Sequence, residues 1–138
     1  MPPQSLARVQ LGSFVLGPAL GTGGTATVYR AVHAPTGAPA AVKVVRPAVR
    51  HDLAAEVRAV VALDHPNIVA VYDVGIVNAA TAAAHPGLVA GTPWFAMELA
   101  DEGSLRRRMR TLDWSELLPI LRGLLSGLAH AHARGVLH

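Results

Sequence analysis

The sequence has no cysteine, so disulfides, thiolate chemistry and cysteine-bound zinc are excluded. Aromatic residues make up 4% of the chain, and Lys and Arg together exceed Asp and Glu by only three. A nucleic-acid surface needs basic residues on one face, interleaved with aromatics. The one dense basic run is Arg106–Arg108 with Arg110. We predict no nucleic-acid partner and interpret the run as a solvated helix face, with docking of acidic partners as the alternative.

Long hydrophobic runs are also missing. The most apolar stretch, residues 117–133, is interrupted by Pro119, Arg122 and two histidines, which makes it too polar for a membrane span. The N-terminus lacks the charged and apolar regions of a secretory signal. We therefore expect a cytoplasmic location and no membrane partner for this chain. Hydrophobic residues make up 51% of its 138 residues, enough to build a core for one domain, or one lobe and part of another.

Short β-rich segments separated by glycine or proline turns dominate the first half of the chain. They predict an antiparallel meander of three strands over residues 14–20, 25–33 and 38–45. A helix is predicted over residues 52–63 from one apolar face, with Asp52 as N-cap and His65-Pro66 beyond its end.

Two further strands are expected over residues 68–76 and 94–99, joined by an irregular loop over 78–92. Residues 104–110 predict a short helix. The last helix is expected over residues 113–134, with Asp113 and Glu116 as a capping box and Gly135 as C-terminal cap. Because Pro119 is unfavourable inside a helix, this helix is expected to begin nearer Glu116 or to bend at the proline.

Three glycines, Gly21, Gly23 and Gly24, lie within four positions. A P-loop needs a lysine and a hydroxyl after its last glycine, at the start of a helix. The dinucleotide fingerprint also needs a helix after its glycines. The segment Thr25-Ala26-Thr27-Val28-Tyr29 favours a strand, which argues against both. On this stretch alone, a hairpin whose glycines only supply positive φ remains equally acceptable.

The order of motifs along the chain decides between these interpretations. Gly21-x-Gly23-x-x-Ala26-x-Val28 is followed by Ala40-Ala41-Val42-Lys43, then by Glu56 on a helix and by His65-Pro66-Asn67-Ile68-Val69. Met97-Glu98-Leu99, Gly103-Ser104-Leu105 and a final segment ending in Gly135-Val136-Leu137-His138 complete the series. From about Phe14 to His138, this set resembles the protein kinase superfamily, specifically the eukaryotic-like serine/threonine kinases of bacteria.

The resemblance implies an α+β fold. Residues 14–100 would form a kinase N-terminal lobe with its hinge, built from a five-stranded antiparallel sheet and one helix. Residues 1–13 would be an N-terminal tail, and residues 101–138 the truncated start of the C-terminal lobe, with its first helices.

The resemblance also implies a nucleotide site. Lys43 would pair with Glu56 and place its charge on the α- and β-phosphates. Glu98 to Ala100 would form the hinge that bonds the adenine edge, and Ser104 would reach the ribose. The third glycine of the family pattern is replaced by Ala26, which we expect to weaken phosphate contact without abolishing it. The remaining expected contacts are Leu20, Gly21, Thr22, Gly23, Gly24, Thr25, Thr27, Val28, Ala41 and Met97.

Each of these roles has a structural alternative. Lys43 would otherwise extend along the apolar strand to solvent, and Glu56 would face water. His130 and His132 are two residues apart, which does not match the i, i+4 spacing of a helical metal pair, so we expect packing or surface histidines. His132 matches a histidine that packs structurally in the family. No metal ligand is predicted in the chain.

ATP with Mg²⁺ is the implied cofactor pair, and protein serine or threonine residues are the implied substrates in the complete family. His138 matches the histidine of the His-Arg-Asp catalytic loop, after which the family has its catalytic base and magnesium ligands. We therefore expect no kinase activity from this polypeptide alone, and leave open whether it belongs to an enzyme. The alternative is a pseudokinase-like module that binds a nucleotide or a partner. The apolar last helix predicts self-association.

Overall fold

The computed structural model describes residues 8–47 and 53–137, with the backbone alone for residues 53–56. The chain divides into two compact units. The sheet unit contains the chain up to residue 53 together with residues 71–99, and the helical unit contains residues 54–70 and 100–138. In the described residues, no helix combines the length and apolarity that crossing a membrane requires.

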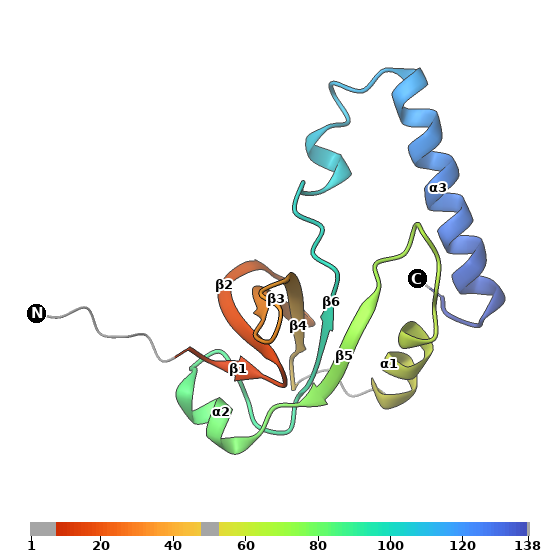
Figure 1. Cartoon of the computed structure of the whole chain (residues 1–138). Coiled ribbons are helices and arrows are strands. Elements are labelled where there is room, and N and C mark those ends of the chain that lie inside the picture. Colours follow the sequence, from red (N-terminus) through yellow and green to blue (C-terminus); the bar gives the residue numbers. More distant parts are fainter. Residues whose placement is uncertain (1–7, 48–52, 138) are drawn as a thin grey trace, which may run out of the picture. The chain divides into compact units, whose positions relative to one another are not determined.

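The sheet unit is an antiparallel sheet of six strands in the order β1-β2-β3-β4-β6-β5 (Figure 1). All five predicted strands are present, within three residues of their expected ends. The sixth, β1, is an addition to the five-stranded prediction: Gln10 and Leu11 pair with Val15 and Phe14 through a tight turn at Gly12, whose φ is +55°. Two residues are too few to show an alternating pattern. The strands are β1 (Gln10–Leu11), β2 (Phe14–Thr22), β3 (Ala26–His33), β4 (Pro39–Val45), β5 (Val71–Ile76) and β6 (Pro93–Met97).

One face of the sheet carries the core. Alternate residues of β3, β4 and β6 point to this face, where Val42 is 0% exposed and Trp94 4% exposed. Both belong to a buried cluster with Tyr29 and Phe14. The opposite face of the same strands is therefore left for the other alternate residues, which include Lys43.

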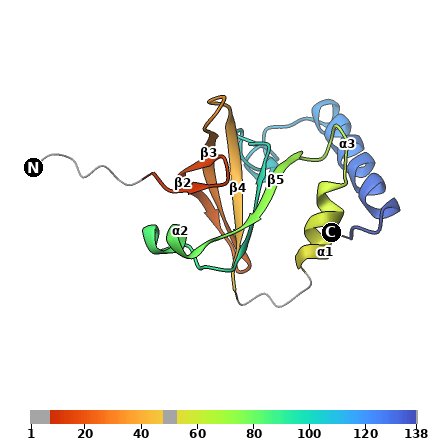
Figure 2. The same ribbon diagram turned by 60° about the horizontal axis from the view of Figure 1, so that its bottom comes forward.

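The segment predicted as an irregular loop, residues 78–92, contains a helix, so that expectation was wrong. Helix α2 (Ala79–Ala84) follows β5 (Figure 2). The Asn78 side chain caps it by accepting a hydrogen bond from the Thr81 backbone N–H at 2.7 Å. Val77 and Leu88, on either side, are buried in the core cluster. A short run of alanine and threonine has helix propensity without an apolar period, so periodicity could not reveal it.

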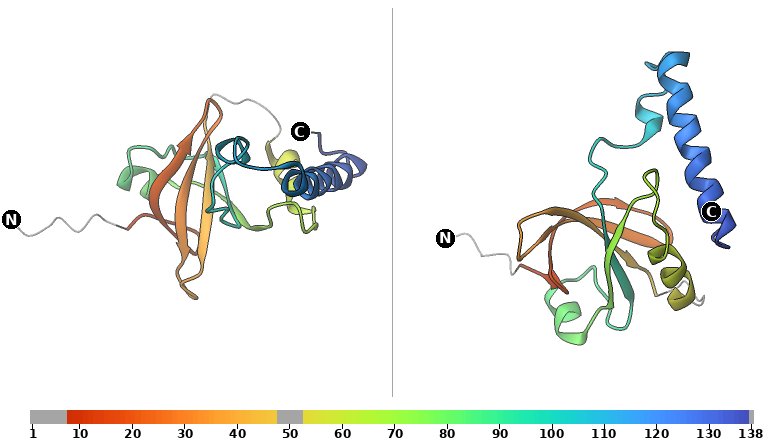
Figure 3. Two further views of the ribbon diagram at one scale, coloured as in Figure 1. Left: turned by 90° about the horizontal axis from the view of Figure 1, so that it is seen from above. Right: turned by 45° about the vertical axis from the view of Figure 1, so that its right-hand side comes forward.

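The helical unit contains α1 (Leu53–Val61), a 3₁₀ turn at Leu105–Arg107 and α3 (Trp114–Ala133). Helix α1 ends at Val61, two residues before the predicted end at residue 63, and its expected cap Asp52 lies outside the described residues. The turn after α1, residues 62–68, lies against α3, where His65 contacts Ser126 (Figure 3). A Cβ at Gly127 would lie 3.2 Å from the backbone oxygen of Asn67, and one at Gly123 would lie 2.8 Å from its side-chain nitrogen. Two glycines one turn apart thus let this turn approach the helix backbone.

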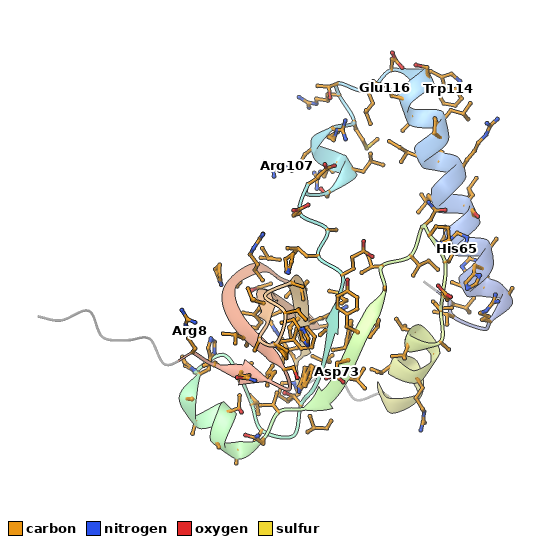
Figure 4. The ribbon with its side chains drawn as sticks, in the orientation of Figure 1. Arg8, His65, Asp73, Arg107, Trp114 and Glu116 are labelled. Carbon is orange, nitrogen blue, oxygen red and sulfur yellow. The ribbon has the colours of Figure 1, made fainter. Side chains whose placement is uncertain are left out.

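Helix α3 has the predicted caps. The Asp113 carboxylate accepts the Glu116 N–H at 2.9 Å, and the side chain of Glu116, which is labelled at the start of α3 in Figure 4, accepts the Asp113 N–H at 3.0 Å. At the other end, Gly135 has a φ of +78°. Of the two alternatives expected for Pro119, a later helix start is wrong, since α3 begins at Trp114 and contains the proline, and a bend at the proline stays a prediction. Because proline has no N–H, the carbonyl of Ser115, four residues earlier, receives no helical hydrogen bond from it. Ser115 is exposed, so water can donate to this carbonyl instead.

Two histidines join the turn after α1 to α3. His65 Nδ1 accepts the Asn67 N–H at 3.0 Å, so the ring proton is on Nε2, which donates to Ser126 Oγ at 3.1 Å. The ring of His130 lies 5.0 Å from that of His65, and its Nε2 is buried without a hydrogen-bond partner. Burial lowers the pKa of His130, Arg134 and His65 lower it further, and Asp64 opposes them. His130 is thus a packing histidine, as expected.

Candidate functional site

The glycine-rich segment forms the hairpin between β2 and β3 (Figure 1), closed by a hydrogen bond from Gly23 N–H to Ala26 O at 2.9 Å. Within the residues that the structure describes, positive φ occurs only at Gly12, Gly37, Gly91, Gly103 and Gly135. Gly21, Gly23 and Gly24 are described, and none of them has a positive φ. The interpretation that these three glycines only supply positive φ is therefore wrong.

What these glycines provide is clearance. A Cβ built at Gly21 or at Gly24 meets no atom within 4 Å, and one at Gly23 meets only the Ala26 oxygen at 3.9 Å. Glycine loses more conformational freedom on folding than any other residue, so it carries a free-energy cost where its φ is not needed. Open space above three such residues is the arrangement that lets a ligand come close to the backbone.

The strand register brings five of the predicted site residues to one face of the sheet. Gly21 pairs with Val28, Val28 with Lys43, and Ala41 with Met97. Directly paired residues, and residues two apart on one strand, share a face. These five residues, which include predicted phosphate-side and adenine-side positions, therefore share the face opposite the core cluster.

Two further predicted residues lie beside the hairpin, Leu20 on β2 and Ala26 on β3. Leu20 lies at an irregularity of the β2–β3 register between Ala19 and Gly21, and its side chain is half exposed. Ala26, which replaces the third glycine of the family pattern, is 7% exposed and pairs with Val45. By alternation Ala26 lies on the face of Val28 and Lys43, where its methyl group is buried. Thr22, Thr25 and Thr27 flank the hairpin, with Thr22 and Thr25 exposed.

Lys43 is half-buried on β4, and its Nζ lies 5.6 Å from the centroid of the Phe95 ring. It forms no ion pair with any carboxylate whose side chain the structure describes. Its predicted partner Glu56 is on α1, but the Glu56 side chain lies outside the described residues. The pairing of Lys43 with Glu56 stays a prediction.

The other predicted residues follow β6 along the chain. Met97 ends the strand, half-buried, and Glu98 comes next. Ala100 and Ser104 belong to the helical unit, where Ser104 precedes the 3₁₀ turn and makes no capping hydrogen bond with its side chain. Gly103, with a φ of +81°, turns the chain before Ser104. The roles in adenine and ribose binding stay predictions.

Sequence reasoning missed Phe95. It lies directly opposite Lys43 in the β4–β6 register and two residues before Met97, so it shares their face. Alternation along β6 could have placed Phe95 on the face of Met97. The pairing with Lys43 could not have been found this way, because β4 and β6 are far apart in sequence.

No group of three or more histidine, aspartate or glutamate side chains close enough to hold a metal ion occurs in residues 8–47 and 57–137.

Comparisons with known proteins agree with this arrangement. The family model described as the protein kinase domain matches residues 14–138. Serine/threonine-protein kinase Pkn1 of Myxococcus xanthus is 33% identical over 96% of the chain, and PknL of Mycobacterium tuberculosis is 34% identical over 86%. CBL-interacting protein kinase 19 of Oryza sativa is 32% identical over 93%. The chain spans 18%, 29% and 24% of the lengths of these three relatives, respectively.

Proposed function

The chain belongs to the protein kinase family, and from this we propose that residues 14–138 are the ATP-binding part of a serine/threonine protein kinase. The whole protein would transfer the terminal phosphoryl group of ATP to serine or threonine residues of other proteins. One observation carries the proposal: three glycines without positive φ leave open space on the hairpin that leads to the Lys43 face.

In this proposal the hairpin covers the nucleotide phosphates, because its backbone can approach them where side chains are missing. The Lys43 ammonium neutralises the α- and β-phosphates, and Glu56 supports it as an ion-pair partner. Leu20, Val28, Ala41 and Met97 enclose the adenine, and the backbone of residues 98–100 bonds its edge.

Phosphoryl transfer depends on positioning and charge neutralisation more than on covalent steps. Mg²⁺ bound with ATP would supply further neutralisation, and we assign none of the 138 residues as its ligand. We also assign none of them as the catalytic base. For the polypeptide of these residues by itself, the proposal is therefore nucleotide binding without phosphoryl transfer.

The first test is the affinity of the purified chain for ATP with Mg²⁺, measured by calorimetry. Lys43→Met should abolish binding or weaken it strongly, since the only ammonium on this face is lost. Arg122→Met is the matched control, because it removes an exposed cation from α3 and should leave the affinity unchanged. Unchanged affinity in Lys43→Met would overturn the proposed role.

The second test addresses the clearance above the hairpin. Gly21→Val and Gly24→Val place side chains where the protein has no atom within 4 Å, so the thermal unfolding temperature should barely change. Both substitutions should nevertheless weaken ATP binding, because the new side chains occupy the space assigned to phosphates. Valine variants that bind ATP like the wild type would refute the assignment.

A further inference from the structure

The contact between Lys43 and Phe95 is built by the sheet. β6 lies between β4 and β5, and Phe95 pairs with Lys43 on one side and with Val74 on the other. Ladders on both sides fix the Phe95 backbone. The Lys43 ammonium lies over the ring at 5.6 Å from its centroid, inside the range of about 6 Å for attraction between a cation and an aromatic face.

The surroundings of Lys43 make this contact matter. Its nearest neighbours in the register on this face, Val28, Ala41 and Val45, are apolar, and Arg30, the other cation of the face on these strands, is exposed beside Ala41. An ammonium near such a surface is costly unless it finds a partner, and a flexible four-carbon stem lets it turn to solvent. The electron-rich face of Phe95 offers a partner at the centre of the sheet. An aliphatic residue of similar size would fill the space without attracting the charge.

We propose that Phe95 is a positioning residue of the nucleotide site, whose ring holds the Lys43 ammonium in place before a phosphate ligand arrives. This inference rests on the proposed function and specifies how its key cation is prepared. A positioned cation binds an anion better, because less side-chain freedom is lost on binding. The ring takes one side of the ammonium, and N–H donors remain for phosphate oxygens.

The proposal predicts a selective effect of Phe95→Leu. ATP affinity should fall about two- to fivefold, the range of cation–aromatic attraction at partly exposed sites. Adenosine affinity should not change, because adenosine carries no phosphate to meet Lys43. Phe95→Tyr keeps a ring face and should bind ATP like the wild type. General damage to the sheet would weaken ATP and adenosine alike, so this comparison separates positioning from structural support.

The chain offers an unusually clean readout, because Lys43 is its only lysine. In a sample labelled with ¹³C-lysine, one side-chain signal reports the contact directly. In the free protein, the methylene protons next to Nζ should lie upfield, shielded by the ring, and Phe95→Leu should remove this shift. If the leucine variant does not fold, Phe95→Met makes the same test with a more adaptable side chain.

The outcomes separate this inference from the proposed function. No upfield shift in the free wild type, an equal loss of ATP and adenosine affinity, or tighter ATP binding by Phe95→Leu would each overturn the role of Phe95, even with ATP binding intact. If the wild type binds no ATP, the proposed function fails and the positioning of a phosphate-binding cation fails with it. The chemical shift then still decides whether the ring holds the ammonium.

Discussion

The sheet unit and the helical unit differ in the contacts that stabilise each of them. Of the described residues, every buried apolar side chain except Ala131 belongs to the sheet unit. In the helical unit the large apolar side chains, such as Ile68 and Leu121, are only partly buried, and caps at both ends of α3, close approach at two glycines and the His65–Ser126 hydrogen bond add to them. Complete burial therefore contributes more to the part that carries Lys43 and the hairpin than to the part that carries Ala100 and Ser104.

Exposed leucines mark the helical unit as well. Leu124 and Leu125 on α3 are both more than half exposed. They belong to the apolar last helix behind the expected self-association, which stays a prediction that light scattering on the purified chain can check.

The largest difference between the units is expected in the free energy of unfolding that is lost when the tryptophan of each unit is replaced. Trp94 is 4% exposed in the core, whereas Trp114 is 67% exposed at the start of α3. Trp94→Ala should lower the free energy of unfolding by about 3–5 kcal/mol, the usual cost of a large cavity. Trp114→Ala should change it by about 0.5 kcal/mol or less. Urea unfolding followed by circular dichroism measures both, and similar costs would contradict the contrast in burial.

An intermediate effect is expected where the turn after α1 meets α3. Gly127→Val should destabilise the helical unit by about 1–3 kcal/mol, because the new side chain meets the Asn67 backbone, which cannot rotate away.

Gly123→Ala is the matched control for this substitution. There the nearest atom belongs to the Asn67 side chain, which can move, and alanine is the better helix former by up to about 1 kcal/mol. Amide hydrogen exchange in α3 should therefore speed up in Gly127→Val and slow down in Gly123→Ala. Equal exchange in the two variants would show that the glycine contacts do not hold the turn.

The smallest effect should be a pH dependence of stability that is confined to the helical unit. The pKa of His130 lies below its ordinary value of 6.5, mainly because burial disfavours the imidazolium. The folded state therefore binds fewer protons than the unfolded state, so stability is complete above pH 6.5 and falls as the pH drops from there toward the lowered pKa. Asp64 partly offsets this effect, whereas Arg134 and His65 increase it.

His130→Phe keeps a ring against His65 and removes the titrating group. Exchange of α3 amides, corrected for the intrinsic effect of pH, should rise on acidification in the wild type and stay flatter in this variant. The sheet unit serves as an internal reference. A wild type whose two units respond equally to acid would remove His130 as the cause.

How much the sequence could predict follows from the physics of each element. Strands with alternating or continuous apolar residues and helices with one apolar face were predicted correctly, because burial imposes those periods. Helix α2 was not predicted, because its alanines form no apolar period, and β1 was not predicted, because a strand of two residues shows no alternation. The predicted later start of α3 was wrong, because the low helix propensity of Pro119 was outweighed by the length and the good caps of the helix.

The site divides in the same way. The order of the motifs indicated which segments are strands. Alternation along these strands, together with their register, places Val28, Ala41, Lys43 and Met97 on one face. Phe95 escaped because its partner is far away in sequence. The wrong interpretation of the hairpin glycines arose because sequence cannot separate a glycine needed for its φ from one needed for its missing side chain.

The two tryptophans also give the chain a pair of optical labels, one in each unit. Indole emits at shorter wavelength in an apolar environment than in water, so the fluorescence spectrum should be the sum of a blue component from Trp94 and a red one from Trp114. A water-soluble quencher should extinguish the red component first. Opening of the sheet would then appear as loss of the blue component alone, so the state of the sheet unit can be followed without any added dye.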